Sequence, residues 1–197
     1  MSSDTSIRNR NRVLLIAIFA MFFGSMLVAG VLRFSGWRPA GSKNHGEMLD
    51  PPGDLRSAVP RRVDGGTYAW NPAARIWRIA LAPAATCGRE CVALARSLDT
   101  VWRLTGRNAD RLDVLWICAS TTCALPTGAP RPATLQLLHF DPKLRAALPR
   151  VDEVTYNGRR GVPVYVIDPN GFVILRYPPG FDPAGLRADL AKLLKLK

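Results

Sequence analysis

The sequence is poor in cysteine, histidine and acidic residues. It has four cysteines and two histidines among 197 residues, and four cysteines are too few for a small domain held together by many disulfides. It has no glycine at every third position and no repeat with a period of about 20–50 residues, which excludes collagen and solenoid proteins. A phosphate-binding loop, a Ser-His-Asp set and an H-E-x-x-H zinc motif are also absent. The chemistry of the chain therefore depends on its cysteines.

The scarcity of acidic residues makes the chain strongly basic. It has 15 acidic and 27 basic residues, for a net charge of +12. No stripe of basic residues interleaved with aromatics and no nucleic-acid-binding motif accompanies this charge, so we expect no nucleic-acid partner. A positive surface would attract anionic lipid headgroups or an acidic partner protein. The hydrophobic content of 48% excludes wholesale disorder.

A long apolar run lies near the N-terminus. Residues 13–32 carry no charge, and a helix of this length spans about 30 Å, the thickness of the hydrocarbon core of a bilayer. Arginines flank the run at positions 8, 10, 12 and 33. A cleaved signal peptide is the alternative, but its apolar region is usually only about 7–15 residues long. We therefore predict an uncleaved transmembrane anchor.

The anchor divides the chain into four predicted segments, of which it is one. We predict a cytoplasmic tail over residues 1–12, the anchor over 13–32, an extended linker or arm rich in proline and glycine over 33–66, and a folded domain over 67–197. Basic residues are almost evenly divided between the two flanks, so the positive-inside rule does not decide the orientation. The cysteine pairs suit an oxidising compartment, and we therefore expect the C-terminal domain to lie outside the cytoplasm.

The folded domain alternates short apolar runs with amphipathic ones. The pattern predicts strands at 76–81, 112–118, 135–140, 164–167 and 172–177. Helical spacing follows at 91–102, and the dipeptides Asp141-Pro142 and Asp182-Pro183 are typical helix starts. Helices that connect strands in this order indicate an α/β domain, in which a mixed sheet is flanked by helices.

Cys87 and Cys91 form a C-x3-C motif where the first strand gives way to a helix. At a helix N-terminus, free backbone N–H groups and the helix dipole favour a thiolate over a thiol. A spacing of four places both sulfurs on one side of the helix. Such a pair can bind Cu(I) or be oxidised to a disulfide. A purely structural disulfide is the alternative.

Cys118 and Cys123 form a second pair at the end of the second strand. Outside the cytoplasm we expect them to bond to each other and to hold the short loop between them. Four cysteines allow three pairings, and the sequence does not choose among them. A metal site formed by all four cysteines is a further alternative.

Taken together, the anchor, the arm, the C-x3-C motif after a strand and the segment Tyr165-Val166-Ile167-Asp168-Pro169-Asn170-Gly171 resemble the Sco/SenC family. The resemblance covers about residues 10–197. Members of that family are thioredoxin-fold proteins that deliver copper to cytochrome c oxidase. The arm, from Asn44 to Pro52, is similar to that of small, divergent bacterial relatives. The resemblance implies a thioredoxin-like fold, an anchor in the bacterial inner membrane, a domain in the periplasm, and a respiratory oxidase subunit or another copper-site protein as partner.

The resemblance also implies roles for individual residues. In thioredoxin-like folds, a cis-proline before the fourth strand faces the cysteine motif, and Pro163 stands at this point, so we expect a cis Val162–Pro163 bond. The family's third copper ligand is a histidine, but Arg160 occupies about that place here. Arginine stays protonated and cannot bind copper. We expect neither His45 nor His139 to replace the missing ligand.

Three functions remain open at this stage. The chain could assist oxidase assembly, either by handling Cu(I) at Cys87 and Cys91 or by keeping the copper-ligand cysteines of its partner reduced. It could be a general thiol–disulfide oxidoreductase outside the cytoplasm. It could also be a non-catalytic interaction module that keeps a structural disulfide.

Overall fold

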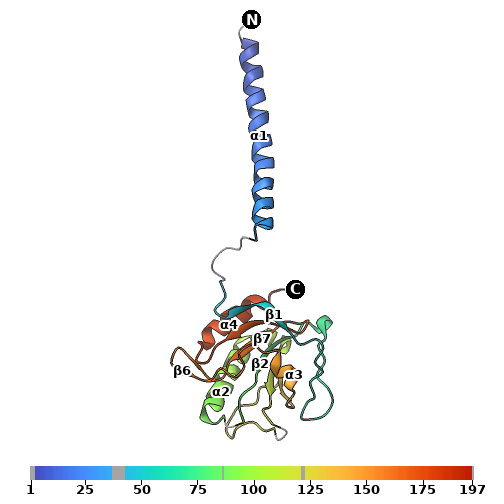
Figure 1. Cartoon of the computed structure of the whole chain (residues 1–197), viewed down its shortest axis with the longest axis vertical. Coiled ribbons are helices and arrows are strands. Elements are labelled where there is room, and N and C mark those ends of the chain that lie inside the picture. Colours follow the sequence, from blue (N-terminus) through green and yellow to red (C-terminus); the bar gives the residue numbers. More distant parts are fainter. Residues whose placement is uncertain (1–2, 37–42, 86, 121–122, 197) are drawn as a thin grey trace. The chain divides into compact units, whose positions relative to one another are not determined.

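The computed structural model describes residues 3–36, 43–85, 87–120 and 123–196 (Figure 1). The chain divides into two compact units, Met1–Ser42 and Lys43–Lys197.

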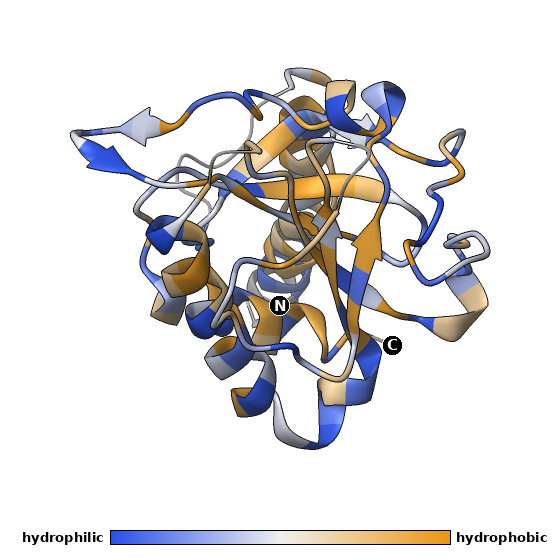
Figure 2. Cartoon of the chain, turned by 90° about the horizontal axis from the view of Figure 1, so that it is seen from below, coloured by the Kyte–Doolittle hydropathy of each residue, from blue (hydrophilic) through white to orange (hydrophobic). Residues whose placement is uncertain are grey.

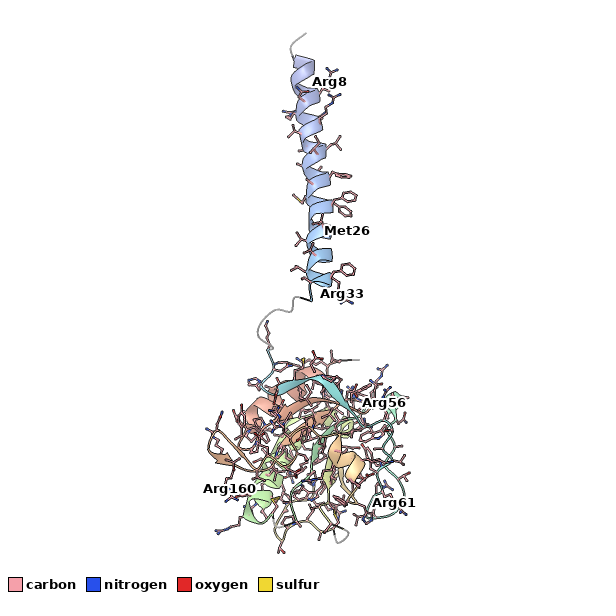
Figure 3. The ribbon with its side chains drawn as sticks, viewed as in Figure 1. Arg8, Met26, Arg33, Arg56, Arg61 and Arg160 are labelled. Carbon is pink, nitrogen blue, oxygen red and sulfur yellow. A yellow bond between two sulfur atoms is a disulfide. The ribbon has the colours of Figure 1, made fainter. Side chains whose placement is uncertain are left out.

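The N-terminal unit consists of helix α1 (Ser3–Phe34). The section Arg8–Phe34 has a mean hydropathy of 2.5 and is long and apolar enough to cross a membrane. Its large apolar side chains are exposed, and Arg8 and Arg33 lie near its opposite ends (Figure 3). The predicted apolar helix is therefore present, and it extends beyond residues 13–32 at both ends.

The second unit is built on a mixed sheet of six strands. In spatial order the strands are β1 (Glu47–Asp54), β8 (Phe172–Tyr177), β7 (Val164–Ile167), β2 (Trp77–Leu81), β3 (Leu112–Ile117) and β4 (Leu135–Leu138). Strands β2, β3 and β4 run parallel to one another, whereas β7 is antiparallel to β2 and β8 is antiparallel to both β7 and β1. All five strands predicted from hydrophobic patterning are present, and the α/β prediction is confirmed.

Three helices cover this sheet. They are α2 (Arg89–Leu104), α3 (Pro142–Ala146) and α4 (Pro183–Leu193). The predicted caps are observed, because Asp141 accepts hydrogen bonds from the backbone N–H groups of Lys143 and Leu144, and Asp182 accepts one from Ala184. A 3₁₀ helix of three residues lies at Pro72–Ala74, and one of six residues lies at Gly106–Arg111. A two-stranded hairpin of β5 (Thr155–Tyr156) and β6 (Arg159–Arg160) completes the unit.

Alternating side chains along each strand form two cores, one on each face of the sheet. The first, here called the cysteine face, joins the strands to α2 and α4 and includes Cys91 and Cys118. The second, the arginine face, joins them to α3 and to the segment around Leu55 and Tyr68. Figure 1 places α2 and α3 on either side of β2 and β7, and Figure 2 shows hydrophobic residues along the strands between them.

The arginine face buries two charged side chains. Arg78 in β2 and Arg176 in β8 are 1% and 0% exposed. The Nε–H of Arg78 donates to the Tyr68 hydroxyl, which donates in turn to the Asp113 carboxylate at 2.6 Å. The terminal nitrogen Nη1 of Arg78 donates to the carbonyl oxygens of residues 168 and 169. These bonds offset the cost of burying a guanidinium among apolar side chains.

Strand β1 corrects the prediction of an extended arm over residues 33–66. Glu47–Asp54 pairs with β8, and the compact unit begins at Lys43 rather than at residue 67. Pro51, Pro52 and Gly53 resemble strand breakers in the sequence. They are tolerated because β1 is an edge strand whose register shifts between Met48 and Gly53.

The beginning of this unit is fastened to its last helix. Asp189 in α4 is 1% exposed and accepts hydrogen bonds from the backbone N–H groups of His45 and Gly46 and from the Tyr177 hydroxyl. The ammonium group of Lys192 contacts both Asp189 and the carbonyl oxygen of Lys43. Burial raises the pKa of Asp189, but these hydrogen bonds outweigh burial and hold the pKa at about 2.

Candidate functional site

Cys87 and Cys91 lie at the start of α2, as predicted, and they are joined by a disulfide with a Cα–Cα distance of 5.6 Å. Gly88 is the N-cap, and no side chain caps the helix there. Cys91 is fully buried on the cysteine face, whereas Cys87 is half-buried. When this pair is reduced, the outer sulfur of Cys87 is therefore the one that a partner can reach. The helix N-terminus favours its thiolate form.

Arg89 and Glu90 flank the pair and are both exposed. Their charges have opposite signs, so neither dominates the entrance to the pair. The helix terminus is therefore the main fixed source of positive potential beside Cys87 among the described residues.

Cys118 and Cys123 are joined by the second disulfide, with a Cα–Cα distance of 5.5 Å. Of the three pairings that four cysteines allow, the structure therefore has the one that joins Cys87 to Cys91 and Cys118 to Cys123. Cys118 is 4% exposed and Cys123 is half-buried. Each disulfide accordingly joins one buried and one half-buried cysteine.

The two disulfides border one cavity of about 220 Å³. Cys87 lines it from the loop after β2, and Cys118 and Cys123 line it from the loop after β3. The spacing of the cysteines in the sequence does not indicate that the two pairs are neighbours. Their proximity follows from the parallel pairing of β2 and β3, which brings the carboxyl ends of both strands to one edge of the sheet. Recognition of two neighbouring parallel strands, each followed by a cysteine pair, could have revealed it.

Neither histidine accompanies the cysteines. The Nδ1 atom of His45 lies 3.2 Å from the Asp189 carboxylate, and His139 lines a different cavity with Arg61 and Phe140. Within the described residues, no group of three or more histidine, cysteine, aspartate or glutamate side chains could hold a metal ion. The hydrogen bond of His45 and the cavity that His139 lines thus involve residues other than the cysteines.

The expectation of a cis bond before Pro163 is wrong. Among the described peptide bonds, Asp50–Pro51 alone is cis, so Val162–Pro163 is trans. Pro163 immediately precedes β7, where a missing N–H group does not interrupt the sheet and the ordinary trans bond can be kept. Pro163 is nevertheless buried, and Val162 belongs to the same apolar core as Cys91. The proline thus remains near the cysteine face without the expected geometry.

Arg160, which stands about where the family has its third ligand, is exposed on β6 (Figure 3). It lines a cavity of about 250 Å³ together with Glu90 of α2 and with Val162. The neighbouring Arg159 donates to the carbonyl oxygen of Gly180. Arg160 and Glu90, which lies in the first turn of α2, therefore share one cavity, and Cys87 is not among the residues that line it.

Comparisons with solved structures show which known fold this unit has. BsSco, a member of the Sco family of cytochrome c oxidase assembly proteins, matches with 11% identity and a TM-score of 0.54, over 77% of this chain and 98% of its own. A copper-bound ScoI from Arabidopsis thaliana matches with 13% identity and a TM-score of 0.52, over 77% and 99%. A SCO1/SenC family lipoprotein from Bacillus anthracis matches with 15% identity and a TM-score of 0.52, over 75% and 99%.

At these identities the matches establish the fold, and the predicted likeness to Sco/SenC proteins is confirmed at that level. A comparison with curated proteins found no match. The family model described as "Transmembrane-like, thioredoxin-like, C-terminal domain" matches residues 77–197, which include both disulfides and the helices α2, α3 and α4. The chain therefore belongs to this transmembrane-like, thioredoxin-like family.

Proposed function

We propose that the chain is a membrane-anchored, thioredoxin-like factor for the assembly of a cytochrome c oxidase, and that it acts through Cys87 and Cys91. The observation that carries the proposal is the placement of this pair at the start of α2 in a Sco-like fold, with Cys91 buried and Cys87 half-buried. α1 would anchor the protein in the bacterial inner membrane. The domain would then lie in the periplasm, where such a pair can cycle between dithiol and disulfide.

Of the two possible tasks, the site favours reduction of a partner's copper-ligand cysteines over stable copper binding. Two thiolates can hold Cu(I), but Cu(II) prefers nitrogen and oxygen ligands. Neither histidine lies at the cysteine pair. Reduction needs only the Cys87 thiolate, which attacks the disulfide of the partner, and Cys91, which then displaces the partner by closing the Cys87–Cys91 bond.

The test is a double Cys87→Ser, Cys91→Ser variant expressed in place of the natural protein. We expect lower oxidase activity and less copper in the oxidase, while the variant itself accumulates in the membrane as the natural protein does. Arg96→Ser, an exposed change one turn further along α2, is the matched control and should leave both measurements unchanged. Normal copper content in the double variant would contradict the proposal.

A general thiol–disulfide oxidoreductase is the second candidate, and the lack of a histidine at the pair favours it. The two functions differ in their substrate range. A general oxidoreductase would reduce unrelated model disulfides as fast as a peptide with the paired cysteines of an oxidase copper site. An assembly factor should prefer the copper-site peptide.

The orientation requires its own experiment. Alkaline phosphatase fused after the C-terminal residue is active only when it is exported. We expect an active fusion. An inactive phosphatase, together with an active cytoplasmic reporter at the same position, would reverse the proposed topology.

A further inference from the structure

The cavity between the disulfides is the feature that the proposed function leaves unexplained. Its described lining consists of Cys87, Cys118, Cys123 and small or apolar neighbours, with Trp116 as the largest side chain. No charged residue is among these lining residues. A thiolate that enters such a space has neither a cation to pair with nor a described cluster of metal ligands to join. Two disulfides that border one space can exchange partners with each other.

The burial of the four cysteines is matched between the two pairs. The two inner cysteines, Cys91 and Cys118, are 0% and 4% exposed, whereas the outer ones, Cys87 and Cys123, are half-buried. Both outer residues line the shared cavity. Once either pair is reduced, its outer side chain is free to rotate about χ1 between staggered positions. Exchange between Cys87 and Cys123 across the shared cavity would leave the two inner cysteines buried.

Cys123 also lines a second and wider cavity, of about 400 Å³, together with Asp64 and Arg131. Cys87 is not among the residues that line this second cavity. The second pair can thus be approached from a side that the first pair does not face. This gives the two disulfides separate access routes and one common space.

We propose that Cys118–Cys123 is a second redox-active pair that exchanges two electrons with Cys87–Cys91 across the shared cavity. This inference rests on the proposed redox function of Cys87 and Cys91. An external dithiol protein would reduce one pair, and the other pair would deliver the electrons to the target disulfide. The second disulfide then passes electrons within the protein, in a relay, and does not merely hold the loop between Cys118 and Cys123.

The exchange is balanced in atoms and electrons. With the second pair reduced, the Cys123 thiolate attacks the sulfur of Cys87, which forms a Cys87–Cys123 bond and breaks Cys87–Cys91. Cys91 leaves as a thiolate and takes up a proton. Cys118 then loses its proton and attacks Cys123, which forms Cys118–Cys123 and releases Cys87 as a thiolate. Two electrons have moved from the second pair to the first, and the same steps in reverse return them.

The intermediate can be trapped in the full-length chain. A Cys91→Ser, Cys118→Ser variant keeps only the two outer cysteines, and we expect them to form a disulfide under mild oxidation. The mirror variant Cys87→Ser, Cys123→Ser keeps only the inner pair and is the matched control. Trypsin separates Cys87, in residues 79–89, from both later cysteines, in residues 112–143, so mass spectrometry identifies the link directly.

We expect the outer pair to link at least about tenfold faster than the inner pair, because exchange rates depend on access to the attacked sulfur. No link in the outer variant, or equal rates in the two variants, would overturn the relay. Circular dichroism and thermal melting of both variants check that each has folded.

A second measurement needs no substitution. The oxidised natural protein is treated with enough reductant to open one disulfide per molecule, and free thiols are located by differential alkylation. We expect thiols at both pairs.

The outcomes separate the two proposals. Complete reduction of Cys87–Cys91 with Cys118–Cys123 still closed would overturn the relay and leave the proposed function intact. Failure of Cys87–Cys91 to be reduced at all would overturn both.

Discussion

On the cysteine face, the sheet packs against α2 and α4 through apolar side chains, and its reactive atoms are sulfurs in two disulfides. On the arginine face, the same strands bury two guanidinium groups, and the guanidinium of Arg78 takes part in long-range hydrogen bonds. The sulfurs can exchange partners with each other, whereas removal of Arg78 takes away the hydrogen bond that its Nε–H donates to Tyr68, the residue that holds the Asp113 carboxylate. The comparison assigns chemistry to one face and conformational stability to the other.

The largest expected effect is on the arginine face. Arg78→Met should lower the free energy of unfolding by about 3 kcal/mol, because it removes one partner of a buried charged network. Burial already raises the pKa of Asp113, while Tyr68 and Arg78 lower it, so loss of Arg78 should raise this pKa further. Denaturant titration checks the stability, with the exposed Arg96→Met as control. A variant as stable as the control would break the distinction between the faces.

Asp189 tests the comparison between the two faces from the other side, because it is a buried charge at the edge of the cysteine face. Its pKa is about 2 in the folded protein, against an ordinary value of 3.8. A lowered folded pKa stabilises the protein above pH 4, and this contribution is lost as the pH falls from about 4 to 2. Asp189→Asn should therefore cost on the order of 2 kcal/mol at neutral pH and should flatten the acid limb of the stability curve.

Thermal melting between pH 2 and pH 7 measures this effect, and Asp110→Asn, at an exposed position, is the control. We expect the control to follow the natural protein throughout. An unchanged acid limb in Asp189→Asn would show that another carboxylate is responsible.

Arg176 is as deeply buried as Arg78, but we expect a smaller effect from its loss. Its carboxylate partners, Glu47 and Glu153, have side chains that are 45% and 29% exposed, so both can turn to solvent when the guanidinium is removed. Its Nε–H also has no hydrogen-bond partner among the described residues. Arg176→Met should cost about 1 kcal/mol or less. A loss equal to that of Arg78→Met would mean that burial of the arginine, and not burial of its partners, sets the cost.

The smallest effect on stability is expected at Arg160, which is exposed on β6. Arg160→His should change the free energy of unfolding by less than about 0.5 kcal/mol. It places an imidazole where the Sco/SenC resemblance calls for a copper ligand, and we expect the reduced variant to bind Cu(II) more tightly than the natural protein. Arg159→His is the matched control. Equal copper binding in both variants would show that position 160 does not face the cysteines.

The local parts of this fold were predictable from the sequence, and the long-range parts were not. Strands such as Val164–Ile167 and the Asp182 cap depend on neighbouring residues, and they lie where the pattern predicts them. The burial of Arg78 depends on Tyr68 and Asp113, which are distant in the sequence, so no local signal reveals it. Strand β1 was missed because only its edge position makes Pro51 and Pro52 acceptable.

The candidate site divides in the same way. The C-x3-C and C-x4-C spacings indicated both cysteine pairs directly. The common cavity depends on the parallel pairing of β2 and β3, and the trans bond before Pro163 depends on how β7 begins. Spacing thus identified the sulfurs, whereas only the sheet reveals that they share one space.

The fastening of the first residues of the domain to α4 has a mechanical consequence. Tension that arrives along the chain from residues ahead of Lys43 would be resisted first by the bonds that Asp189 and Lys192 make to Lys43, His45 and Gly46. The β1–β8 pairing stands behind them in series and would be loaded only after they yield. The carboxylate of Asp189 on the last helix would therefore protect the pairing of the edge strand β1 from tension along the chain.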